Sequence, residues 1–144
     1  MPSKVFVITG PSGVGKGTLI KALLASCPSL ELSISATTRQ PREGEADGRD
    51  YYFLSAEEFE RRKNERDFLE FATYSGNHSG TLRSEVDRRL GEGRSVVLEI
   101  AVQGAQQVRA AARATAEAEK AARRRSRAAK KAARTRAANR RRAS

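Results

Sequence analysis

The chain has 144 residues, of which 38% are apolar and 31% are charged, enough for one modest domain. No apolar run approaches the length of about 18 residues that a transmembrane helix requires, and the N-terminal apolar stretch is too short for a signal peptide. A single cysteine and a single histidine exclude a disulfide framework and a metal cluster built from such residues. We expect a cytoplasmic protein that does not enter a membrane.

The positive charge is confined to one end of the chain. The formal net charge is +11, yet residues 1–108 carry 14 Lys and Arg against 15 Asp and Glu. Residues 109–144 carry the other 14 basic residues against only 2 Glu. The sequence therefore predicts a first domain over residues 1–108 and a basic tail over residues 109–144.

The first domain alternates between strand-like and helix-like segments. Short apolar runs bounded by glycine, proline and polar residues are typical of buried strands, and apolar residues at helical spacing indicate the helices between them. Ser55 with Glu58 forms a capping box at the start of one helix, and Thr81 is expected to cap another. We expect strands over 5–9, 30–35, 51–54, 68–74 and 96–100, helices over 19–25, from Ser55 and over 81–90, and loops over 39–50 and from 75 through Gly80. This order predicts an α/β fold with a parallel sheet covered on both faces.

The tail has a different composition. Of its 36 residues, 15 are Ala, and none is Leu, Ile, Val, Phe, Tyr or Trp. Ala and Arg favour a helix, but no apolar stripe could dock it and its like charges oppose it. We expect a helix to about Lys120 and disorder beyond.

The strongest motif lies between the first strand and the first helix. Glycines at positions 10 and 15 followed by Lys16 allow backbone N–H groups to surround a phosphate at a helix N-terminus, and the lysine would contact the β- and γ-phosphates. Gly17 stands where Ser or Thr usually binds magnesium, and Thr18 follows one position later. A glycine-rich turn without a ligand is the alternative. The predicted ATP phosphate-binding residues are Gly10, Pro11, Ser12, Gly13, Val14, Gly15, Lys16, Gly17 and Thr18.

A polar segment further along suggests a second phosphate site. Arg39 and Arg42 are three residues apart and separated by Pro41, so two guanidinium groups could bind one phosphate dianion. Tyr51 could add a hydroxyl donor. The alternative is that these arginines are only solvated loop charges.

Residues 4–108 resemble the guanylate kinase family of nucleoside monophosphate kinases, which transfer phosphate from ATP to GMP. The resemblance implies a P-loop nucleoside triphosphate fold and purine nucleotide metabolism, with Mg²⁺ bridging the ATP phosphates. It rests on five ordered blocks, which are residues 10–18, 35–45, 48–51, 68–70 and 98–105.

The resemblance also implies roles for individual residues. Lys16, Arg39 and Arg42 would serve catalysis. Glu70 has a chemical reason of its own, because a carboxylate accepts hydrogen bonds from N1–H and N2–H₂ of guanine, which adenine does not offer; an exposed strand glutamate is the alternative. The implied GMP-binding residues are Ser35, Arg39, Arg42, Tyr51, Glu70 and Thr81.

The sequence departs from the family in three places. Ser79 stands where the family usually has a tyrosine, and Ala101 stands where it usually has an aspartate. Glu99 remains as an acidic candidate to contact magnesium, through water; a solvated charge at the end of a strand is the alternative. After Arg109 the family continues with further strands and an arginine-bearing lid helix that the tail does not resemble. We therefore expect a fold truncated at its C-terminus, an exposed edge on the 5–9 strand, weak stability or association, and impaired turnover.

Two readings of the tail remain open. A frameshift in a GC-rich gene would produce this Ala- and Arg-rich composition. Alternatively, a basic arm maintained by selection would bind nucleic acid through its clustered charge. For the whole chain, the alternatives to a guanylate kinase are an inactive GMP-binding remnant and a basic nucleic-acid-binding protein.

Overall fold

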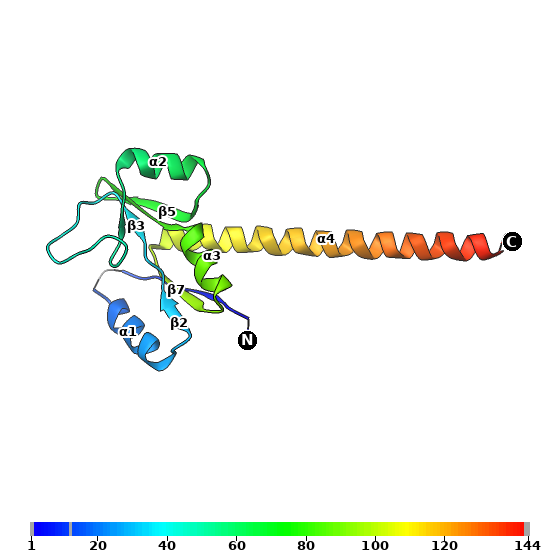
Figure 1. Ribbon diagram of the computed structural model, residues 1–144, viewed down its shortest axis with the longest axis horizontal. Helices are drawn as coiled ribbons and strands as arrows, with labels where there is room; N and C mark the ends of the chain where they lie inside the picture. The colour runs from blue at the N-terminus through cyan, green and yellow to red at the C-terminus, as the bar shows by residue number, and fades with distance from the viewer. Residues whose placement is uncertain (1, 12, 143–144) are drawn as a thin grey trace. The chain divides into compact units, whose positions relative to one another are not determined.

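The computed structural model describes residues 2–11 and 13–142. The chain divides into two compact units, Met1–Val108 and Arg109–Ser144 (Figure 1). No helix of the described residues is both long and apolar enough to cross a membrane.

A three-stranded parallel sheet forms one half of the first unit. The strand order is β1-β7-β2, which confirms the predicted parallel sheet. Both neighbouring strands pair with β7, whose residues Val96, Val97 and Leu98 are at most 1% exposed. The strands are β1 (Val5–Ile8), β2 (Leu30–Leu32) and β7 (Ser95–Glu99).

A second, mixed sheet of four strands was not expected from the sequence. Its order is β4-β3-β6-β5, and β5 pairs antiparallel with β6. The expected loop through Gly80 is wrong, because Ser75 and Gly76 both have positive φ and so form a two-residue hairpin turn that starts a new strand. The strands are β3 (Ala36–Thr37), β4 (Tyr52–Phe53), β5 (Phe68–Tyr74) and β6 (Asn77–Leu82).

Over residues 2–11 and 13–142, the helices agree in number with those expected from the sequence but differ in some boundaries. Ser55 Oγ accepts a hydrogen bond from the Glu58 N–H at 3.1 Å, which confirms that cap. Thr81 does not cap the next helix, since it lies within β6 and Leu82 precedes the helix instead. The last helix extends to Arg142 where we expected disorder beyond Lys120, because its Ala and Arg residues have high helix propensity. The helices are α1 (Lys16–Ser26), α2 (Ala56–Asn64), α3 (Arg83–Gly91) and α4 (Val102–Arg142).

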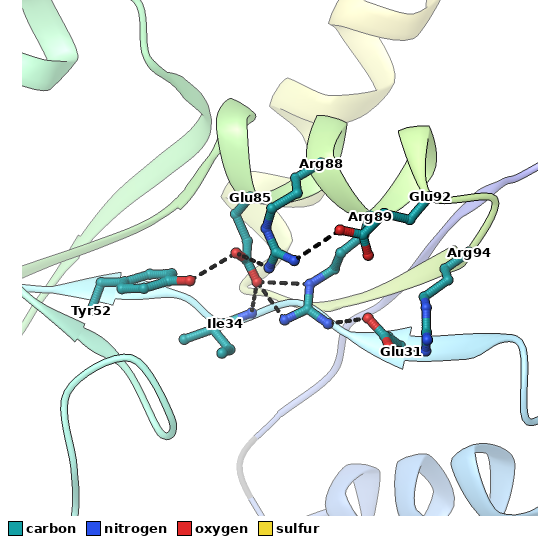
Figure 2. Close-up of polar contacts among 8 residues, drawn as sticks. All are labelled: Glu31, Ile34, Tyr52, Glu85, Arg88, Arg89, Glu92 and Arg94. Carbon is teal, nitrogen blue, oxygen red and sulfur yellow. Dashed lines mark hydrogen bonds and ion pairs between the residues drawn. The ribbon is translucent and has the colours of Figure 1, made fainter.

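Glu85 of α3 joins the two sheets, and its side chain is almost fully buried, with 4% exposed. Its carboxylate accepts hydrogen bonds from the Ile34 N–H at 3.2 Å, between β2 and β3, and from the Tyr52 hydroxyl at 2.8 Å, in β4 (Figure 2). Arg89 donates to it at 2.8 Å and also pairs with Glu31 of β2. Although burial opposes ionisation, the hydrogen bonds from Tyr52 and Arg89 lower the pKa of Glu85.

Removal of the Glu85 carboxylate should therefore destabilise the first unit strongly. Glu85→Ala leaves the Arg89 guanidinium and the Tyr52 hydroxyl without their shared acceptor, and we expect a loss of about 3–5 kcal/mol in the free energy of unfolding. Glu92→Ala, which removes only a surface pair with Arg88 at 3.5 Å, should cost less than about 1 kcal/mol. Urea unfolding measures both, and equal losses would contradict this account.

Strand β1 lies at the edge of the parallel sheet, and its side chains are open to solvent. Within the described residues it pairs only with β7. Val5, Phe6 and Val7 are 37%, 48% and 36% exposed, which matches the exposed edge expected from the sequence. An apolar edge strand offers unpaired backbone groups to another chain.

Charge placed on this edge should reduce self-association. We expect Phe6→Lys to weaken it at least about tenfold, which corresponds to about 1.4 kcal/mol, because a lysine is poorly accommodated between paired strands. Tyr74→Lys is the matched control, since Tyr74 is 83% exposed and lies in the other sheet. Sedimentation velocity over a concentration series measures both, and the same effect in both variants would rule out β1 as the contact.

Candidate functional site

The glycine-rich loop follows β1 and leads directly into α1. Gly13 and Gly15 have φ values of 77° and 96°, a left-handed conformation that favours glycine. Gly15 is the N-cap of α1, so the free N–H groups of the first helical turn lie next to the loop. Ser12, a predicted phosphate ligand, lies outside the described residues.

Lys16 folds back onto its own loop. Its ammonium donates to the carbonyl of Gly10 and, at 3.4 Å, to that of Pro11. These are weak partners for a cation, so a phosphate could replace them without breaking a buried ion pair.

Glu99 lies at the same sheet edge as this loop. It ends β7 opposite Ile8, the last residue of β1, and the strands are parallel, so their carboxyl ends meet. Its side chain is exposed. No group of three His, Cys, Asp or Glu in the described part of the chain could hold a metal. A single carboxylate supplies only one ligand group, which Mg²⁺ can accept because it usually keeps several waters.

The Arg39 side chain contacts both Tyr51 and Glu45, a residue that the sequence analysis did not single out. Glu45 accepts two hydrogen bonds from the Arg39 guanidinium, at 2.8 and 3.0 Å, and one from the backbone N–H of Arg42 at 2.7 Å. The Arg39 hydrogen bonds, followed by the one from Arg42, lower the pKa of Glu45 to about 2. The Arg39 guanidinium also lies 5.1 Å from the centre of the Tyr51 ring.

In this conformation the Arg39 guanidinium therefore faces Glu45. The arginines do not form the open pair of cations that the spacing alone suggested. The sequence feature that could have indicated this pairing is Glu45, a carboxylate in the same loop as Arg39. Gly44, with a φ of 81°, turns the chain so that Glu45 lies next to Arg39.

Glu70 and Thr81 form the third group, in the second sheet. They are cross-strand neighbours in β5 and β6, and the Thr81 hydroxyl donates to Glu70 Oε1 at 2.7 Å. Glu70 is only 4% exposed, so the alternative of an exposed strand glutamate is wrong. Burial raises the pKa of Glu70, against the hydrogen bonds from Thr81, which lower it.

Gly104, near the start of α4, lies against the Glu70 side chain. A methyl group added at Gly104 would collide with Glu70 Oε2, so a glycine there permits the first turn of α4 to approach Glu70 closely. Ser35 lies in the segment that joins the sheets, where its carbonyl accepts the Tyr52 N–H at 2.9 Å. The importance of Gly104 is visible only when two segments 34 residues apart are brought together.

Comparison with known proteins gives the family of the chain. The guanylate kinase family model matches residues 2–139. Guanylate kinases from Synechococcus elongatus and Rubrobacter xylanophilus are 58% and 57% identical over 106 residues, which is 74% of this chain. The crystal structure of guanylate kinase from Anaplasma phagocytophilum aligns with a TM-score of 0.60 and 33% identity over 73% of this chain. The chain therefore belongs to the guanylate kinase family.

The match covers only part of each relative. The aligned region is 58% of the Synechococcus protein, 56% of the Rubrobacter protein and 52% of the Anaplasma chain. The chain thus spans a little over half the length of the relatives it resembles.

The buried Glu70 carboxyl should make the fold less stable at neutral pH. Because its folded-state pKa is raised, its ionisation opposes folding above that pKa, and protonation at lower pH relieves the penalty. Glu70→Gln keeps an acceptor for Thr81 without the charge, and we expect a gain of about 1 kcal/mol in the free energy of unfolding at neutral pH. The gain should vanish at about pH 3, which lies below the pKa of the carboxyl in both the unfolded and the folded state.

Urea unfolding at the two pH values measures this difference. Glu57→Gln, at an exposed helix position, is the control and should leave stability nearly unchanged. A Glu70→Gln variant that is less stable than the parent chain at neutral pH would contradict the assignment of Glu70 as a buried, penalised charge.

Proposed function

We propose that the chain binds GMP and ATP and transfers the γ-phosphoryl group of ATP to GMP, forming GDP. The observation that carries this proposal is the buried pair of Glu70 and Thr81. An anionic acceptor held in a nearly dry site, beside a hydroxyl, suits the N1–H and N2–H₂ donors of guanine and discriminates against adenine. Ser35, in the segment between the sheets, would add a further contact to the base.

The ATP phosphates would lie in the loop of residues 10–18. The free N–H groups at the start of α1 and the Lys16 ammonium would bind them. Magnesium, when bound with ATP, would neutralise charge on the β- and γ-phosphates. Glu99 would contact that ion at most through water.

The phosphate of GMP would be held by Arg39, Arg42 and Tyr51. Glu45 holds the Arg39 guanidinium but contacts Arg42 only through its backbone N–H, so the Arg42 guanidinium would engage the phosphate first. The phosphate dianion would then compete with Glu45 for Arg39. This competition gives the loop two states, one paired internally and one paired with ligand.

Catalysis would consist of positioning and charge neutralisation. An oxygen of the GMP phosphate attacks the γ-phosphorus in line, so no side chain of the protein has to form a covalent bond. Ser79, in place of the family's tyrosine, would remove one hydrogen bond to the GMP phosphate. A bond of that kind contributes about 1.5–3 kcal/mol, so GMP affinity should be about 10- to 150-fold lower than with a tyrosine.

The test is an ADP-release assay with ATP, magnesium and GMP, with AMP as the control acceptor. We expect slow turnover that depends on GMP and falls about 100-fold or more in Lys16→Ala, which removes charge stabilisation from the transferred group. Calorimetry should show GMP binding in the parent chain and at least about tenfold weaker binding in Glu70→Gln.

The two readouts separate the alternatives. GMP binding without turnover would support the alternative of an inactive GMP-binding protein. Absence of both would overturn the proposal, provided that circular dichroism shows a folded chain.

A further inference from the structure

The second unit carries most of its positive charge on one face of a helix. Residues 109–142 are helical and, apart from the half-buried Ala111, exposed. An α-helix turns about 100° per residue, so residues separated by three, four or seven positions share a face. The cationic stripe defined in this way consists of Arg109, Arg113, Lys120, Arg124, Arg127 and Lys131.

The regularity of the stripe is not forced by composition. Eleven of the 14 Lys and Arg residues fall within one third of the helix circumference, and Arg125, Arg136 and Arg140 are the exceptions. Lys120, Arg124 and Arg127 border one hollow on the helix surface together with Arg123 and Ser126. Most alanines, such as Ala110, Ala121 and Ala132, occupy the opposite face.

The residues outside the cationic stripe help to identify the class of partner, because they include no large apolar or aromatic side chains. A helix that lies in a membrane surface buries large apolar side chains opposite its cations, and residues 109–142 contain no Leu, Ile, Val, Met, Phe, Tyr or Trp. The same lack of aromatic residues removes the stacking contacts that single-stranded nucleic acids use. A regular row of phosphates is the ligand that a regular row of cations fits best.

We infer that residues 109–142 form an arm that binds double-stranded nucleic acid through the phosphates, without sequence preference. The stripe from Arg109 to Lys131 is about 33 Å long at 1.5 Å per residue, which is about the length of ten base pairs. Its six cations would contact about six phosphates, and each contact releases counterions. This inference is independent of GMP phosphorylation.

The experiment measures fluorescence anisotropy of a labelled 30-base-pair DNA duplex titrated with the full chain at several salt concentrations. We expect binding to weaken with salt with a logarithmic slope of about −5, or 0.9 for each of six phosphate contacts. Two duplexes of unrelated sequence should bind equally well.

Paired variants test the stripe itself. Arg124→Ala with Arg127→Ala removes two stripe cations, while Arg125→Ala with Arg136→Ala removes two cations from other faces, so both variants have the same net charge. The stripe variant should bind about 10- to 60-fold more weakly at about 0.1 M salt and lose about 2 from the slope, whereas the control should change little. Arg124→Lys with Arg127→Lys should bind like the parent chain.

Several outcomes would overturn the inference. They are equal losses in the two alanine variants, equal or tighter binding to phosphatidylserine vesicles or to a single-stranded 30-mer, and no duplex binding at about 0.1 M salt. Circular dichroism of each variant checks that the helix persists, which alanine substitutions should favour.

Discussion

The carboxylate of Glu85 is the interaction on which the first unit depends. A buried anion is tolerated only when its lone pairs are satisfied, and Glu85 accepts from the segment between the sheets, from β4 and from its own helix. These three donors must therefore keep fixed relative positions. Ser35 follows the Ile34 donor and Tyr51 precedes the Tyr52 donor, so two candidate GMP ligands are positioned by one carboxylate.

The pKa values of two buried glutamates in this unit shift in opposite directions, that of Glu85 downward and that of Glu70 upward. Glu85 has cationic and hydroxyl donors that lower its pKa. Glu70 accepts a hydrogen bond from Thr81, no arginine in the described part of the chain pairs with it, and burial raises its pKa. The charge of Glu85 is compensated by its donors, so this carboxylate stabilises the fold. The charge of Glu70 is poorly compensated, so its carboxylate could still accept hydrogen bonds from a ligand. Loss of stability at such a position is typical of a functional site.

Local signals in the sequence predicted local structure well. The glycine-rich loop, the Ser55 cap and the apolar strand that became β7 each depend on neighbours within a few residues. Contacts between distant segments could not be predicted from the sequence. Glu85 lies 51 residues from Ile34, and the residues next to it in the sequence do not indicate that it links the two sheets. Thr81 shows the same limit, because one hydroxyl could cap a helix or bind Glu70, and only the β5–β6 pairing decides between them.

Different interactions stabilise the two units, and the difference is relevant to the role proposed for residues 109–142. The first unit has nearly balanced charge and depends on buried contacts. In residues 109–142 the helix depends on the propensity of Ala and Arg, while crowded cations on one face oppose it. A polyanion along that face would turn the repulsion into attraction and stabilise the helix it binds. Charge spread evenly around the helix would reduce the repulsion, so the cationic stripe is consistent with the phosphate-binding arm proposed above.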